Sequence, residues 1–224
     1  EHTVRIDDHT EIHAQRFVIA TGSRPFILPD WEKLGDKLIV NDDVFYWDDL
    51  PKSVAVFGPG VVGLEIGQAL HRLAVDTKIF GRSGNLGNIS DPVVLKEATT
   101  VLSEELQLHL NTKTSVSLTA DNRVEVRWNE QGDEKVFIAD YLLGSTGRSP
   151  NTDRIGLENL DIKLDNKGVP IANPLTMQTS IPHIFMAGDA SNQLPLLHEA
   201  SDQGKIAGQN AGAYPNISNG LRRS

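Results

Sequence analysis

The chain of 224 residues contains no cysteine. These residues alone can form no disulfide and supply no thiolate, and the absence is compatible with a reducing compartment. The seven histidines follow no ligand-like spacing, so we predict no metal site. The histidines without a partner pattern, including His71 and His109, are expected at the surface.

Long hydrophobic runs and an excess of positive charge are also missing. No run of about twenty apolar residues occurs, and the first ten residues, EHTVRIDDHT, are charged, so we expect neither a membrane span nor a signal peptide, and a cytoplasmic location. The net charge is −9. Because nucleic acids and anionic membranes are bound by positive surfaces, we expect neither as a partner.

The composition is that of a globular protein, with 39% hydrophobic residues. A chain of this length can bury a core as one large domain or two small ones. We find no repeat and no low-complexity tract, so order is expected nearly throughout.

A strand–helix–strand unit is predicted in the first half of the chain. Residues 53–58 form a β-branched apolar run typical of a buried strand. Apolar residues then recur at helical spacing from Val62 to Leu73, and residues 76–80 read as the next strand.

Other segments carry weaker local signals. Residues 16–20 are an apolar run that ends in a turn, and residues 25–37 are expected to be an irregular connector because Pro25 and Pro29 disfavour regular structure. Asp91 followed by Pro92 favours a helix start. Alternation on both sides of NEQGD predicts a hairpin over residues 122–138. Strands leading into turns are expected at 140–151 and 181–190, and a helix at 196–214.

The stretch FGPGVVGLE joins the predicted strand to the predicted helix. Its glycines are spaced Gly-x-Gly-x-x-Gly, which between a strand and a helix predicts a dinucleotide-binding loop, with an ordinary glycine turn as the alternative. Gly58 makes the tight turn, Gly60 lets a pyrophosphate approach the backbone, and Gly63 lets helix and strand pack closely. We expect the pyrophosphate at the helix N-terminus, where free N–H groups favour negative charge. The candidate loop residues are Gly58, Pro59, Gly60, Val61, Val62 and Gly63.

The end of the second strand distinguishes NAD from NADP. NAD sites place an acid there for the ribose, whereas NADP sites use an arginine for the 2′-phosphate. Here Gly81 occupies the acid position and Arg82 follows it, which favours NADP. A small neutral turn that leaves the ribose in water is compatible with NAD and stays open.

Three further glycine turns accompany this loop: IATGSRP (19–25), GSTGRSPN (144–151) and TSIPHIFMAGDA (179–190). In this order around one Gly-x-Gly-x-x-Gly-x-Glu loop they resemble the flavin-dependent pyridine nucleotide-disulfide oxidoreductases, and among these the dihydrolipoamide dehydrogenase-like branch. Residues 48–73 are similar to that family's entry into its nicotinamide domain. Residues 194–211 resemble its helix that points at the flavin. The resemblance covers essentially the whole chain.

The resemblance implies an α/β fold: a Rossmann-like nicotinamide-dinucleotide domain with an antiparallel β-meander, inserted in a partial FAD-binding domain of the same general type. The implied boundaries are 1–40 for part of the FAD-binding domain and the connector, 41–147 for the NAD(P)-binding domain, and 148–224 for the returning FAD-binding part.

The resemblance also assigns roles to residues near the nicotinamide. Glu65 matches the family's glutamate close to the meeting point of nicotinamide and flavin, and an ordinary first-turn acid that stabilises the helix dipole is the alternative. Gly147 matches a turn beside the nicotinamide end, and Arg148 is expected to be structural.

Flavin-side residues follow in the same way. Thr21, Gly22 and Ser23 match the turn that touches the flavin. Gly188 and Asp189 match the turn whose aspartate binds the ribityl chain, with a turn-forming Asp as the alternative. Leu196, Leu197 and His198 match the helix start whose backbone N–H groups face the flavin pyrimidine, so His198 is assigned a position and no catalytic role.

The family's first glycine loop, redox cysteine pair and C-terminal dimerisation domain have no counterpart in these residues. We therefore expect the central portion of an FAD-dependent NAD(P)H:disulfide oxidoreductase, whose parent is a homodimer and exchanges hydride between nicotinamide and FAD. By itself the portion should bind a nicotinamide dinucleotide weakly, bind FAD poorly and lack reductase activity.

Two alternatives remain. One is a related two-dinucleotide flavoprotein without redox cysteines, such as a ferredoxin reductase or an NADH oxidase, although the LLHEASDQGK helix favours the disulfide branch. The other is a non-enzymatic nucleotide-sensing Rossmann module, in which the turns ATGSRP and AGDA would have no use.

Overall fold

The computed structural model describes residues 2–222. The chain divides into two compact units, residues 25–148 and residues 1–24 with 149–224. The chain passes between the units twice, and the strands at these crossings, β4 (Ser23–Pro25) and β13 (Arg148–Pro150), form a two-stranded sheet.

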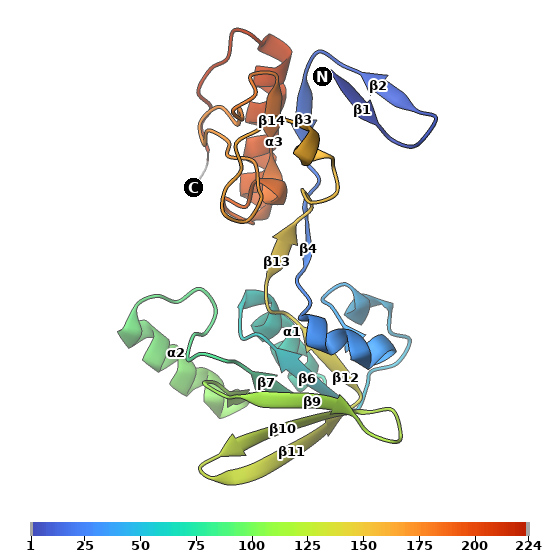
Figure 1. The fold of residues 1–224 in the computed structure, drawn as a ribbon. Coiled ribbons are helices and arrows are strands. Elements are labelled where there is room, and N and C mark those ends of the chain that lie inside the picture. Colours follow the sequence, from blue (N-terminus) through green and yellow to red (C-terminus); the bar gives the residue numbers. More distant parts are fainter. Residues whose placement is uncertain (1, 223–224) are drawn as a thin grey trace. The chain divides into compact units, whose positions relative to one another are not determined.

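The unit of residues 25–148 contains a five-stranded parallel sheet and a three-stranded antiparallel sheet (Figure 1). The parallel sheet has the order β5-β12-β6-β7-β8 and the antiparallel sheet the order β11-β10-β9. The strands are β5 (Leu38–Ile39), β6 (Ser53–Phe57), β7 (Asp76–Phe80), β8 (Gln107–His109), β9 (Thr114–Leu118), β10 (Val124–Glu130), β11 (Asp133–Ala139) and β12 (Tyr141–Gly144). The helices are η1 (Pro29–Lys37), η2 (Asp43–Tyr46), α1 (Val61–Arg72) and α2 (Pro92–Glu105). The predicted α/β class is confirmed.

Strand β6 has core on both of its faces. Val54 and Val56 pack with Leu70 of α1, whereas Ala55 and Phe57 pack with the antiparallel sheet, including Val126. Because successive strand side chains point to opposite faces, an unbroken apolar run is what a doubly covered parallel strand requires.

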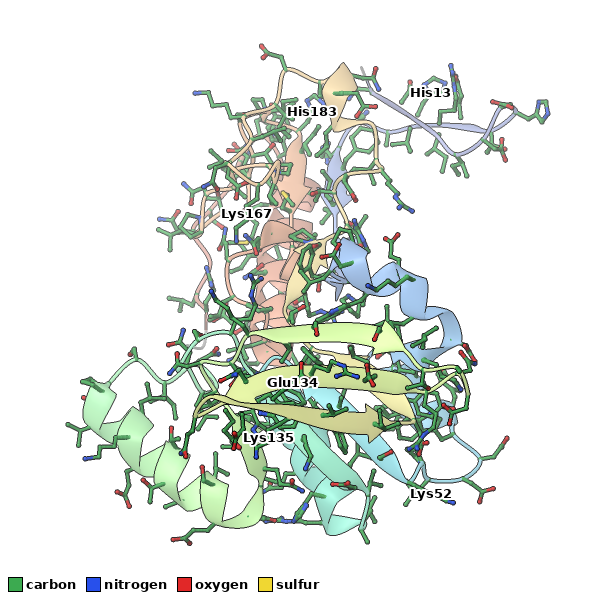
Figure 2. All side chains as sticks on the ribbon, turned by 60° about the horizontal axis from the view of Figure 1, so that its bottom comes forward. His13, Lys52, Glu134, Lys135, Lys167 and His183 are labelled. Carbon is green, nitrogen blue, oxygen red and sulfur yellow. The ribbon has the colours of Figure 1, made fainter. Side chains whose placement is uncertain are left out.

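The short local signals that predict elements here are confirmed. Asp91 caps α2 by accepting hydrogen bonds from the N–H groups of Val93 (2.8 Å) and Val94 (3.0 Å). The predicted hairpin is β10–β11, and its two-residue turn has positive φ at Gln131 and Gly132, the geometry that suits the strand twist. Glu134, labelled in Figure 2, forms an ion pair from β11 to Arg127 of β10 (3.1 Å).

The prediction of an irregular connector holds for residues 26–28, but it is wrong for Pro25, which lies in β4, and from Pro29 onward. The 3-10 helix η1 begins at Pro29, and its side chains Trp31 (6% exposed) and Leu34 (1% exposed) lie in the core. Proline is tolerated at a first helical position because its missing N–H has no partner there in any case. This segment also belongs to the compact unit that carries the glycine loop.

The other unit is built around β3 (Phe17–Ile19) and β14 (Ile184–Met186), which pair in parallel. Helix α3 (Leu197–Ala213) packs on them through Ile206 and Ala207, which join Phe185 in one core cluster. An antiparallel hairpin of β1 (Thr3–Arg5) and β2 (Glu11–His13), and the 3-10 helices η3 (Leu157–Asn159) and η4 (Gly188–Ser191), complete the unit (Figure 1).

No helix within residues 2–222 is both long enough and apolar enough to span a membrane.

Candidate functional site

The glycine loop follows β6 and leads directly into α1, as the sequence predicts. Gly58 has φ of +105°, and a Cβ there would lie 2.4 Å from the Ser145 carbonyl oxygen. A Cβ on Gly63 would lie 2.0 Å from the Gly58 carbonyl oxygen. Both positions therefore admit only glycine, Gly58 by conformation and contact and Gly63 by contact.

Gly60 differs from the other two glycines. A Cβ there would meet nothing within 4 Å, and no side chain caps the helix start that it forms. The first backbone N–H groups of a helix have no partner within the helix. The loop thus leaves open space beside uncapped N–H groups, an arrangement that fits a phosphate.

Ser145 is a site residue that the sequence pattern does not single out. Its hydroxyl lies 2.8 Å from the Phe57 carbonyl and 2.9 Å from that of Gly58, each of which can accept its proton. It follows β12, the parallel neighbour of β6, where Gly144 pairs with Phe57. Only this pairing brings Ser145 to the glycine turn, so local sequence gives no signal for it.

Besides Gly63, three of the predicted site residues lie on α1. Val61 and Val62 are exposed at its first turn (47% and 38%), which leaves apolar surface beside the loop. Glu65 is exposed but lies past the first turn. The alternative that Glu65 is a first-turn acid is therefore wrong, because the helix begins at Val61.

Gly81 lies buried directly after β7, and Arg82 is exposed next to it. Arg82 has no hydrogen bond or ion pair with any described residue. The structure thus places a free cation where the sequence predicts the 2′-phosphate contact.

His109 contradicts the expectation of a surface histidine. Its side chain is 15% exposed and stacks on Phe80 with ring centroids 5.1 Å apart, while its Nδ1 lies 3.4 Å from Glu130. Burial lowers the pKa of His109, and the Glu130 charge opposes this only in part. The residue is partly buried because Trp128 and Glu130 of the antiparallel sheet cover the end of β8, a contact that sequence spacing does not reveal.

Gly147 has φ of +125°, a conformation that requires glycine. Its carbonyl accepts a hydrogen bond from the Phe26 N–H (2.9 Å). Arg148 makes interactions within the structure.

The second group of predicted residues lies in the unit of residues 1–24 and 149–224. The turn of Thr21 to Ser23 follows β3, and Gly188 and Asp189 follow β14, its parallel partner. The Ser23 hydroxyl donates to the Asp189 carboxylate at 2.8 Å. Parallel pairing thus brings two turns that are distant in sequence to one sheet edge.

Asn151 fixes the first of these turns. Its backbone N–H donates to the Gly22 carbonyl (2.9 Å), and its side-chain amide donates to the Thr21 carbonyl (3.0 Å). Arg24 contacts Asn151 and forms a two-point ion pair with Asp153 (3.0 and 2.6 Å). The hydrogen bond from Arg24 lowers the pKa of the Asp153 carboxyl.

The start of α3 is open. Leu196, Leu197 and His198 are exposed, and no side chain caps the helix. Just inside, the buried Glu199 carboxylate is ion-paired with Arg222 (2.6 Å).

Gln203 of α3 is a second residue that the sequence pattern does not single out. It is fully buried, and its Oε1 accepts hydrogen bonds from the Gly188 N–H (3.0 Å) and the Ser191 hydroxyl (3.1 Å). This glutamine therefore ties α3 to the turn that carries Asp189.

Within residues 2–222, no three histidine, aspartate or glutamate side chains come together as a metal site would require. The parallel sheet with its glycine turn at a helix start places the chain in the class of α/β proteins with dinucleotide-binding geometry.

The chain belongs to the pyridine nucleotide-disulphide oxidoreductase family, whose model matches residues 1–204. The family uses FAD and NAD(P).

Individual relatives agree with this assignment. The dihydrolipoyl dehydrogenase of Geobacillus stearothermophilus is 30% identical over 95% of this chain and 46% of its own length. That of Staphylococcus aureus is 30% identical over 92% of this chain and 45% of its own. The chain therefore spans about half the length of these curated relatives.

Solved structures show the same fold. LpdA from Mycobacterium tuberculosis superposes with a TM-score of 0.79 at 26% identity, over 95% of this chain and 45% of its own. The HOCl-induced flavoprotein disulfide reductase of Escherichia coli gives 0.81 at 18% identity, over 98% of this chain and 49% of its own. At that lower identity the likeness concerns the fold alone.

Proposed function

We propose that these residues form the nicotinamide-binding portion, with part of the FAD-binding portion, of a dihydrolipoyl dehydrogenase-like NAD(P)H:disulfide oxidoreductase. The observation that carries the proposal is the glycine loop. Gly58 and Gly63 are closed by backbone contacts, whereas Gly60 opens onto uncapped helix N–H groups. In a turn that binds no ligand, nothing would require glycine at position 60, where a Cβ would meet only open space.

The nicotinamide domain is assigned to the compact unit of residues 25–148, which contains the predicted range 41–147. In it, the N–H groups at the start of α1 bind the pyrophosphate, and Gly147 and Glu65 lie at the nicotinamide end. Arg82 binds the 2′-phosphate, so NADP is the preferred dinucleotide.

The FAD-binding part is assigned to residues 1–24 and 149–224. The Asp189 carboxylate, held by the Ser23 hydroxyl, accepts hydrogen bonds from the ribityl chain. The free N–H groups after Leu196 face the flavin pyrimidine, and Gln203 positions the Asp189 turn.

FAD, when bound, supplies the hydride and electron chemistry between nicotinamide and a disulfide. These residues contribute binding, orientation and fixed charge. Because the chain has no cysteine, the thiols for disulfide exchange must come from outside these residues. We therefore expect the chain to show no disulfide reductase activity. Because only part of an FAD site is assigned to these residues, we also expect weak FAD binding, and a full complement of copurified FAD would contradict this.

The first test is a titration of the 224-residue chain with NADH and NADPH, followed by tryptophan quenching and nicotinamide fluorescence. We expect NADPH to bind more tightly, and Arg82→Glu to reverse the order, because the substitution replaces the phosphate ligand with a like charge. Lys96→Glu, which makes the same charge change on exposed α2, is the control and should leave the order unchanged.

Each other result has a defined meaning. Equal or tighter binding of NADH would show that GRSGN is a neutral turn and that Arg82 binds no phosphate. If neither dinucleotide binds, the 224-residue chain by itself does not have the proposed binding function.

A further inference from the structure

The clearest unexplained feature near the glycine loop is the glycine at position 81. Its φ lies outside the left-handed region, so the backbone does not require glycine there. A Cβ at this position would lie 2.8 Å from Cγ and 3.1 Å from Cδ of Pro59, and 3.2 Å from Leu110. The space for a side chain is therefore taken mainly by the ring of the loop proline.

Neither side of this contact is free to move away. The Gly81 N–H donates to the His109 carbonyl (3.0 Å), and the Gly81 carbonyl accepts from the Thr112 N–H (2.9 Å). The Pro59 carbonyl accepts from the Gly87 N–H at 2.7 Å. The Leu110 atom is the end of a flexible side chain and can move, whereas the Pro59 ring is fused to the backbone. Pro59 is therefore the residue that prevents a side chain at position 81.

Position 81 is where an NAD site places the acid that binds the adenosine ribose. A carboxylate there would need a Cβ, and Pro59 excludes it. Immediately beyond, Arg82 is exposed and has no hydrogen-bond or ion-pair partner among residues 2–222.

We propose that Pro59 and Gly81 are a matched pair that sets dinucleotide specificity. The proline in the pyrophosphate loop keeps the ribose position free of an acid, and thereby directs the site to a dinucleotide with a 2′-phosphate. Specificity is thus determined partly by a residue that touches neither the ribose nor its phosphate. The inference rests on the proposed function and deepens it.

The test is a double-mutant cycle in the 224-residue chain. Pro59→Ala removes both Cγ and Cδ, the two proline atoms in the contact, and keeps a φ that alanine adopts freely. Gly81→Glu adds the acid, and Gly81→Ala adds the Cβ without charge. Thermal unfolding and the dissociation constants for NADH and NADPH are measured for each single and double variant.

We expect Gly81→Ala and Gly81→Glu to lower Tm and to weaken both dinucleotides in the presence of Pro59. With Pro59→Ala, most of the Tm should return. The Pro59→Ala/Gly81→Glu protein should shift the NADH-to-NADPH affinity ratio at least tenfold toward NADH relative to Pro59→Ala, whereas Pro59→Ala/Gly81→Ala should not.

The inference is overturned if Gly81→Glu alone keeps its Tm and gains NADH affinity, or if Pro59→Ala fails to rescue it. Equal binding of NADH and NADPH by the wild-type chain would also overturn it, together with the proposed role of Arg82, but would leave the proposed binding of a nicotinamide dinucleotide intact. If the wild-type chain binds neither dinucleotide, the proposed function and the specificity inference fail together, although the Tm cycle still decides whether Pro59 and Gly81 are sterically coupled.

Discussion

At the scale of single residues, the glycines of the loop serve two different purposes, which the sequence alone does not distinguish. Gly58 and Gly63 are needed because another part of the protein occupies the place of a Cβ, whereas Gly60 faces open space. The first kind supports the fold, and the second kind is needed only when a ligand approaches the backbone.

This difference predicts opposite outcomes for two alanine variants. Gly63→Ala should destabilise the protein by about 1–3 kcal/mol or more, because its Cβ would meet the Gly58 carbonyl. Gly60→Ala should lower stability by less than about 1 kcal/mol yet weaken NADPH binding roughly tenfold or more. Urea unfolding and nucleotide titration on the same samples measure both effects. A Gly60→Ala protein that binds NADPH normally would refute the assignment of the open space to a pyrophosphate.

His109 gives a pH prediction at the same scale. Because burial lowers its pKa in the folded state, the unfolded chain binds the proton more readily, and stability falls as the pH drops through about 6.5. His109→Phe keeps the stack on Phe80 and removes the titration, so its Tm should decline less between pH 7.5 and 5.5.

The matched control is His13→Asn, which removes a histidine from the exposed β1–β2 hairpin, where Figure 2 labels it. It should reproduce the wild-type pH dependence. If His109→Phe also does so, His109 contributes nothing to acid sensitivity.

At the scale of elements, α1 ends in a motif that normally uses glycine. The Ala74 N–H donates to the His71 carbonyl (2.9 Å) and the Val75 N–H donates to that of Leu70 (3.0 Å), with Ala74 at φ of +64°. This is the Schellman pattern, in which the left-handed residue is usually glycine because a Cβ is disfavoured there.

Ala74→Gly should therefore stabilise the unit of residues 25–148 by about 0.5–1 kcal/mol, since relief of the left-handed alanine exceeds the added freedom of the unfolded chain. Thermal unfolding should show a rise in Tm of roughly 2 °C. Ala69→Gly, at an exposed position inside α1, is the control and should lose about 1 kcal/mol. A loss of stability in both variants would contradict the Schellman interpretation.

Elements with self-contained signals could be predicted from the sequence. The Asp91 cap and the turn at Gln131 and Gly132 each depend on a few neighbouring residues, and both are confirmed. Strands β8 and β9 have weak patterns of their own and were not predicted, because each is defined by the strand it pairs with.

At the scale of the whole molecule, each compact unit has its own hydrophobic clusters. The unit of residues 25–148 buries two, one on each face of the parallel sheet. The chain enters and leaves this unit through the paired strands β4 and β13, so its two ends lie side by side.

We accordingly expect residues 25–148, expressed alone, to fold cooperatively and to retain the NADPH affinity of the 224-residue chain within roughly threefold, a difference of less than about 1 kcal/mol. Circular dichroism and nucleotide titration test this. Gly63→Ala in the same excised unit should lower its free energy of unfolding by the same amount as in the 224-residue chain, a response to a specific contact that a collapsed state would not give. An unfolded wild-type excised unit would refute the proposed domain assignment.

The sequence by itself determined the local devices: the strand–glycine loop–helix unit, the helix cap, the hairpin turn and the family to which they belong. These depend on conformational preferences of a few adjacent residues. The tertiary structure alone decided that Ser145 holds the glycine turn, that His109 is partly buried, that Ser23 meets Asp189, and that Pro59 closes position 81. Each of these is a contact between residues distant in sequence, and its existence depends on strand order and register, which no local pattern encodes.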